Sequence, residues 1–150
     1  MLNTKVLVSK FIAVAKLAGV PLTEEDVRVD PRRKPHRPPT CLPPGKMAVY
    51  AFFFNGRCLK VGKVGPNSEA RYTSQHYLPN SSPSNLAKSM LKNKSDFRNL
   101  TRANAGAWIK KNTDRINFLL DQKKGNPALS LLEAFLHCRL EPRFEGAECR

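Results

Sequence analysis

An Asn-Gly pair between two β-prone runs is the feature of this sequence that most constrains its fold. Residues 49–54 are β-branched, aromatic or alanine, Asn55-Gly56 follows, and a second β-prone run covers residues 57–62. This pattern is a strong short-range signal for a β-hairpin. The segment after Gly62 carries Arg71 and His76 and has a helical pattern. The sequence therefore predicts a hairpin followed by a helix.

The length of the hairpin turn decides which side chains share a face of the sheet. A three-residue loop over residues 54–56, with Gly56 in the left-handed conformation, would set Tyr50 opposite Lys60 on the same face. A two-residue loop made of Asn55 and Gly56 would put Tyr50 and Lys60 on opposite faces. We expect the three-residue loop.

The rest of the chain alternates between strand-like and helix-like patterns. Together they predict an α+β fold, with a small three-stranded antiparallel sheet flanked by helices and a short helical N-terminal appendage. The expected strands cover residues 47–54, 57–62 and 115–121. The expected helices cover residues 68–78 and 127–140, with one or two more between residues 83 and 112.

The first third of the chain differs from the rest in composition. Residues 1–19 have the pattern of an amphipathic helix and residues 23–26 that of a capped short helix, so residues 1–29 are expected to form a helical appendage. Residues 30–46 contain repeated prolines, which exclude helix and central strand, and are interpreted as an extended basic linker. Residues 47–150 would form the main domain.

The charge balance points to a polyanionic partner. The chain has 26 Lys and Arg against 12 Asp and Glu, a formal net charge of +14 and an isoelectric point near 10.1. Nucleic acid is the natural partner because backbone phosphates attract distributed cations, while ribosomes and anionic membrane surfaces are the alternatives. Either basic segment could equally be a solvated surface. The candidate contacts are Arg32, Arg33, Lys34 and Arg37 in the linker and Lys88, Lys92 and Lys94 further on.

The cysteines favour a reducing compartment. They are too widely spaced for a zinc site, and Cys58 in a strand and Cys138 on an apolar helix suit buried free thiols. No apolar run is long enough to span a bilayer. We expect a cytoplasmic protein, nucleoid-associated if bacterial, with no membrane partner.

One acidic residue stands in an apolar context. Glu133 lies within the apolar pattern of residues 129–136, where an unpaired carboxylate would be costly to bury. A Mg²⁺ ion held by one carboxylate, several waters and a substrate phosphate would satisfy it, with Mn²⁺ as the alternative ion. Otherwise Glu133 points outward or pairs with a Lys or Arg.

Over residues 47–146 the chain resembles the GIY-YIG nuclease family. The family's two tripeptides would fall on residues 48–50 (Ala-Val-Tyr) and 60–62 (Lys-Val-Gly), its helix arginine on Arg71 and its metal-binding glutamate on Glu133. The resemblance implies a metal-dependent DNA endonuclease that hydrolyses phosphodiester bonds through an activated water. The chain departs from the family at Lys60, where the second tyrosine would stand, and has no asparagine after the last helix.

The resemblance also suggests roles for individual side chains. Tyr50 would be the general base or the group that orients the attacking water. A phenol with a pKa near 10 needs nearby positive charge to act as a base, and Lys60 would either supply that charge or bind a phosphate. Arg71 would stabilise the charge that builds on the scissile phosphate. His76 is the base if Tyr50 is not. Further contacts with DNA are expected from Gly62, Lys63 and Tyr72.

Two other functions remain open from the sequence. A non-catalytic basic module on the same fold would bind DNA or structured RNA without needing a metal and would tolerate loss of Glu133. A ribosome-associated protein would prefer structured RNA. For the nuclease we expect double-stranded DNA as the partner, and a monomer or a homodimer.

Overall fold

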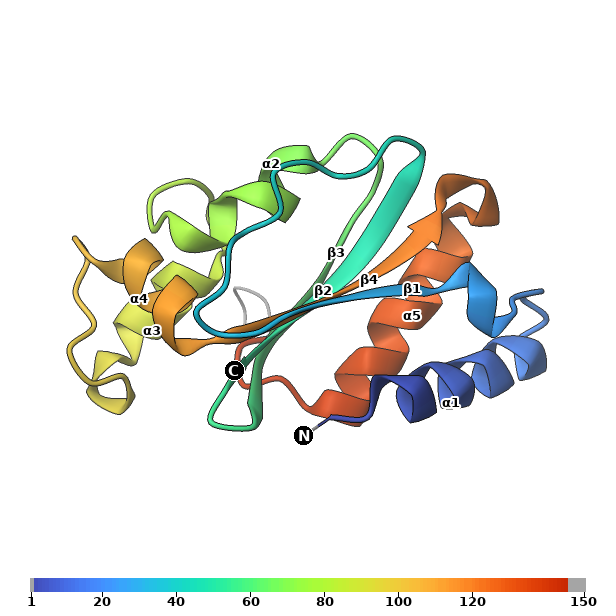
Figure 1. Cartoon of the computed structure of the whole chain (residues 1–150), viewed down its shortest axis with the longest axis horizontal. Helices are drawn as coiled ribbons and strands as arrows, with labels where there is room; N and C mark the ends of the chain where they lie inside the picture. The colour runs from blue at the N-terminus through green and yellow to red at the C-terminus, as the bar shows by residue number, and fades with distance from the viewer. Residues whose placement is uncertain (1, 146–150) are drawn as a thin grey trace.

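A four-stranded antiparallel sheet forms the centre of the molecule. The computed structural model describes residues 2–145. The sheet has the order β1-β4-β2-β3 (Figure 1). The α+β class is confirmed, and the expected three-stranded sheet gains a fourth strand. The strands are β1 (Arg28–Arg32), β2 (Lys46–Phe54), β3 (Arg57–Val64) and β4 (Asp114–Asp121).

The additional strand comes from the segment interpreted as appendage and linker. β1 pairs with β4 from Arg28 opposite Leu119 to Arg32 opposite Arg115. It contains Pro31, which the sheet accommodates because β1 lies at an edge and proline is excluded only from central strands. The prolines therefore did not exclude a strand here, contrary to the expectation of an extended linker beginning at residue 30.

The hairpin between β2 and β3 has a two-residue turn, so the expected three-residue loop is wrong. Asn55 and Gly56 both have positive φ, 49° and 77°, as a tight hairpin turn requires. A β-bulge beyond the turn shifts the register by one residue, so Tyr50 pairs with Gly62. The bulge also reverses, beyond Leu59, which side chains of β3 point to which face of the sheet. Tyr50 and Lys60 therefore still share a face.

Within residues 2–145, five α-helices accompany the sheet. The expected helix over residues 68–78 divides at Ser74, whose hydroxyl donates to the Ala70 carbonyl and competes with the helical backbone. A 3₁₀ turn over Gln75–Tyr77 follows. The expected helix over residues 127–140 is confirmed and begins two residues earlier. The helices are α1 (Thr4–Leu17), α2 (Glu69–Thr73), α3 (Leu86–Lys92), α4 (Ala105–Asn112) and α5 (Gly125–Leu140).

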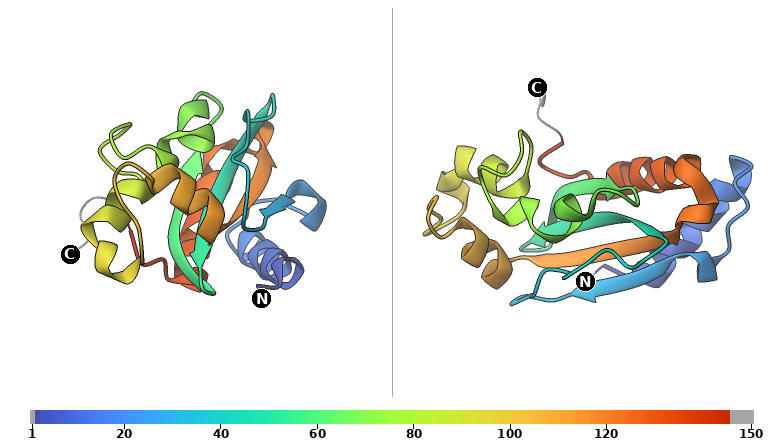
Figure 2. Two further views of the ribbon diagram at one scale, coloured as in Figure 1. Left: turned by 60° about the vertical axis from the view of Figure 1, so that its left-hand side comes forward. Right: turned by 90° about the horizontal axis from the view of Figure 1, so that it is seen from above.

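The helices cover both faces of the sheet (Figure 2). α1 and α5 pack on one face, where Phe11 and Leu132 meet Val49 and Phe118. The short helices α2, α3 and α4 close the other face around an aromatic cluster that includes Tyr50. α1 thus shares a core with the sheet, although the sequence suggested a separate appendage.

The two thiols expected to be buried differ in exposure. Cys58 is buried in β3 and burial raises its pKa to about 12, whereas Cys138 is exposed on α5. Across residues 2–145, no helix combines the length and apolarity needed to cross a membrane.

Candidate active site

A cleft of about 330 Å³ lies beside β3 and is bounded by residues of α2 and α5. It brings together four residues that the sequence singled out from three separate elements. β3 contributes Lys60 and Gly62, α2 contributes Arg71, and α5 contributes Glu133. The remaining lining residues are Val61, Ala134 and His137. We refer to this pocket as the β3 cleft.

Tyr50 lies directly beneath the β3 cleft and accepts two hydrogen bonds. Arg71 Nε donates to the Tyr50 hydroxyl oxygen at 3.1 Å. His76 Nε2 lies 2.6 Å from the same oxygen. Because the Leu86 N–H donates to His76 Nδ1 at 3.2 Å, that nitrogen is unprotonated, and the neutral ring donates through Nε2 to Tyr50. Arg71 is therefore held by a buried Tyr50–His76 pair.

The environment of Tyr50 shifts its pKa opposite to the direction expected from the sequence. Burial raises the pKa of Tyr50, while the positive charges of Arg71 and Arg115 oppose that shift without cancelling it. The side chain is fully buried, so its hydroxyl does not reach the solvent of the cleft. This geometry does not provide the phenolate base that was expected. It supports a role for Tyr50 in holding Arg71.

His76 is also unsuited to serve as the alternative general base. Both of its ring nitrogens are engaged, and the ring is almost completely buried. Burial lowers the pKa of His76 well below its ordinary value, and the charges of Arg115, Lys60 and Arg71 lower it further. Lys60, itself buried near Ser84, thus acts electrostatically on His76. His76 is neutral and positions Tyr50.

We expect the neutral His76 to make the protein sensitive to acid. Its folded pKa lies below its unfolded value, so the unfolded state binds more protons and stability falls as the pH drops below about 6.5. Between pH 7.5 and 5.5 the loss due to His76 alone should be on the order of 1 kcal/mol. His76→Gln keeps a donor for Tyr50 and should lose correspondingly less stability over this range in urea unfolding. An equal loss in wild type and variant would contradict the buried neutral ring.

Gly62 forms the floor of the cleft above Tyr50. A Cβ at this position would lie 2.7 Å from Tyr50 Cζ and closer still to the hydroxyl oxygen. We therefore expect Gly62→Ala to displace the ring and to destabilise the fold by about 1–3 kcal/mol. Gly65→Ala is the matched control, because nothing lies within 4 Å of its Cβ and it should change stability little. Urea unfolding measures both; equal stability of the two variants would contradict the close packing.

Glu133 pairs with a lysine in this structure, one of the alternatives that the sequence left open. Lys63 Nζ lies 3.1 Å from Glu133 Oε2 and also donates to Ser130 Oγ at 3.0 Å. Glu133 is partly exposed on the wall of the cleft. Within residues 2–145 no group of three or more metal-binding side chains occurs. The donor set therefore fits Mg²⁺ only as a site that water and a substrate phosphate would complete.

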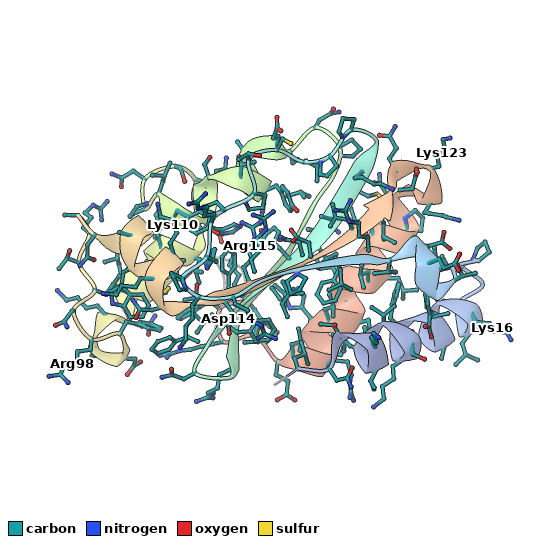
Figure 3. The ribbon with its side chains drawn as sticks, viewed as in Figure 1. Lys16, Arg98, Lys110, Asp114, Arg115 and Lys123 are labelled. Atoms are coloured by element: carbon teal, nitrogen blue, oxygen red, sulfur yellow. The ribbon has the colours of Figure 1, made fainter. Side chains whose placement is uncertain are left out.

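Arg115 on β4 belongs to the same buried network and was missed in the sequence. It is fully buried and donates to the Tyr72 carbonyl at 2.6 Å, to Asn117 Oδ1 at 2.8 Å and to the Tyr77 hydroxyl at 3.2 Å. Its guanidinium lies 5.4 Å from the ring centre of Tyr50. Figure 3 shows it in the middle of the molecule. Arginine and asparagine alternating within an otherwise apolar strand were the available signal.

The other candidate contacts for nucleic acid lie outside the β3 cleft. Tyr72 is buried beneath Arg115, so it is not accessible to DNA as the sequence suggested. Arg32 bonds Asp30 at 2.8 Å, and Arg33 lies 3.7 Å from Asp114. The remaining candidates are Lys34 and Arg37 after β1, Lys88 and Lys92 on α3, and Lys94 just beyond α3.

Comparisons with protein-family models, curated proteins and solved structures found no match to this chain. The residues of the β3 cleft and the charge of the protein are therefore the features that bear on its function.

Proposed function

We propose that the protein is a metal-dependent DNA endonuclease that hydrolyses phosphodiester bonds through an activated water, with the β3 cleft as its active site. The observation that carries this proposal is that an arginine and a carboxylate line the same open cleft. Arg71 comes from α2 and Glu133 from α5. The buried Tyr50–His76 pair fixes the arginine at the cleft.

Arg71 has the geometry to bind the scissile phosphate. Its Nε donates to Tyr50, and within the described part of the chain neither Nη group has a hydrogen-bond partner. Two Nη groups held at a fixed angle can bind two phosphate oxygens and stabilise the charge that develops in the transition state. The hydrogen bond from Nε to Tyr50 orients the two Nη groups. The pKa of Arg71 is raised, most strongly by its contact with Tyr50 and to a smaller extent by the negative charge of Glu133.

Glu133 is the residue that would hold the metal. A divalent cation at its carboxylate would supply positive charge for the phosphate and would lower the pKa of a bound water. Lys63 neutralises the carboxylate at 3.1 Å in the protein alone. If a metal took the place of Lys63 at this carboxylate, the ammonium group of Lys63 would become available to a phosphate. The net charge of +14 favours DNA as the polyanion.

Incubation of the purified protein with supercoiled plasmid tests this function. We expect nicked or linear plasmid with Mg²⁺ or Mn²⁺ and intact plasmid with EDTA, because Glu133 alone does not complete the site. Equal cleavage in EDTA would contradict the metal requirement. Absence of cleavage with both metals would contradict the nuclease function.

A non-catalytic nucleic-acid-binding module is the second candidate. The observation that favours it is the Lys63–Glu133 ion pair, which leaves the carboxylate neutralised without a metal. Such a module would bind DNA or structured RNA equally in Mg²⁺ and in EDTA, with affinity falling steeply as salt rises, and would leave every strand intact.

A further inference from the structure

A second pocket, also of about 330 Å³, lies on α4 and shares no residue with the β3 cleft. α4 stands at the end of the molecule away from α1 (Figure 1). The α4 pocket is lined by Ala107 together with Arg98, Asn99, Asn104, Trp108, Lys111 and Asn112. Trp108 is the only tryptophan of the chain.

Trp108 is held rigidly at the wall of the α4 pocket. Its indole N–H donates to the Arg98 carbonyl at 2.9 Å. Its ring packs against Phe54 and Phe97, with ring centres 5.3 and 5.7 Å away. The side chain remains partly exposed. A fixed, partly exposed indole offers a planar ligand a stacking surface. Binding then loses little side-chain entropy, because the indole is already ordered in the folded protein.

Amide groups with unused hydrogen-bonding capacity surround this ring. Asn112 Nδ2 donates to the Trp108 carbonyl at 2.9 Å, but among the described residues its Oδ1 has no partner. The side-chain amide of Asn99 likewise has no hydrogen bond within residues 2–145. Asn104 uses both ends of its amide to shape the loop, bonding Thr101 and Asn99. Asparagine amides carry the donor and acceptor groups that match the edges of nucleobases.

The rim of the α4 pocket is positively charged. Arg98 and Lys111 are exposed at the pocket. Asp96, the single acidic residue between residues 83 and 112, is bonded to Arg143. The rim therefore attracts phosphate groups beside a stacking surface and free amides.

We propose that the α4 pocket binds an unpaired nucleobase of the DNA, stacked on Trp108, with the amides of Asn99 and Asn112 at its edge and flanking phosphates on Arg98 and Lys111. This inference rests on the nucleic-acid partner of the proposed function but not on catalysis. Bases within a duplex are stacked on their neighbours, so the pocket selects single-stranded or extruded nucleotides.

Because Trp108 is the only tryptophan, its fluorescence reports directly on the pocket. The wild-type protein in EDTA is titrated with a short single-stranded oligothymidylate and with the duplex of the same length. Binding is measured separately by the fluorescence anisotropy of a labelled strand. We expect the single strand to quench the tryptophan emission progressively until binding is saturated. The duplex should bind with little quenching. Trp108→Leu should weaken binding of the single strand about tenfold.

Two charge-matched double variants keep the test independent of Trp108. Arg98→Ala with Lys111→Ala and Lys16→Ala with Lys123→Ala each remove two positive charges, and Lys16 and Lys123 lie at the end of the molecule opposite Arg98 (Figure 3). We expect about tenfold weaker single-strand binding from the first pair and less than about threefold from the second.

Three results would overturn the proposal: binding of the single strand without a change in emission, equal quenching by the duplex, or equal weakening by both double variants. The proposed nuclease function fails separately, through absence of plasmid cleavage. Quenching without cleavage would therefore support base binding in the α4 pocket and contradict the nuclease function. Cleavage without quenching would support the nuclease function and contradict base binding in the α4 pocket.

Discussion

Replacing Arg115 with methionine should destabilise the protein by about 3–5 kcal/mol. The methionine retains most of the apolar stem, but it leaves the Tyr72 carbonyl and Asn117 Oδ1 buried without their donor. A buried acceptor that loses only its partner costs its full desolvation energy, whereas replacing both partners together can be neutral. Such a loss is a large share of the stability of an ordinary domain.

The effect of Arg115→Met should extend to the β3 cleft, because Arg115 lies against the ring of Tyr50. Urea unfolding at neutral pH measures the loss of stability. Arg115→Lys should lose less stability than Arg115→Met, because the ammonium group retains the charge. It should still be less stable than wild type, because one ammonium group cannot bond all three acceptors. The matched control is Arg98→Met at the exposed end of the molecule, which should stay within about 0.5 kcal/mol of wild type. An Arg115→Met protein as stable as wild type would contradict the buried network.

The elements with strong local signals were predictable from the sequence. The β2–β3 hairpin, β4 and α5 follow from composition and periodicity, although the length of the hairpin turn was predicted wrongly. The grouping of Lys60, Gly62, Arg71 and Glu133 around one cleft also agrees with the expectation that these residues share a site. The grouping of these residues could be expected because the family resemblance supplied the order of the strands and helices along the chain.

The bulge in β3 had no local signal because contacts distant in sequence hold it. Leu59 is the extra residue, lying between Cys58, which pairs with Phe53, and Lys60. Cys58 and Leu59 are buried in the cores on opposite faces of the sheet. Their carbonyls accept hydrogen bonds at 3.1 and 2.8 Å from backbone N–H groups at positions 143 and 144. The turn alone therefore predicts the wrong face for Lys60.

β1 and the role of Arg115 were missed for related reasons. Proline counts against strands in general, and only the position of β1 at the edge of the sheet makes Pro31 acceptable. An arginine in a strand normally indicates a solvent-facing side. Here three aromatic rings and three acceptors surround Arg115, and these come from separate parts of the chain.

Glu133→Gln should reduce cleavage by at least about 10²–10³-fold while leaving DNA binding within about twofold of wild type. The amide keeps the size of the side chain but loses the negative charge on which the proposed metal site depends. Binding should be retained, and slightly strengthened, because Lys63 loses its partner and becomes available to phosphate. Glu141→Gln at the exposed C-terminal end of α5 makes the same change of charge outside the cleft and should cut normally.

The most direct test of the nuclease account measures cleavage and binding of one labelled duplex in parallel for wild type, Glu133→Gln and Glu141→Gln, all with Mg²⁺. We expect all three proteins to bind with similar affinity and only Glu133→Gln to fail to cut. Cleavage by Glu133→Gln at the wild-type rate would contradict the placement of the metal and of the active site at the β3 cleft.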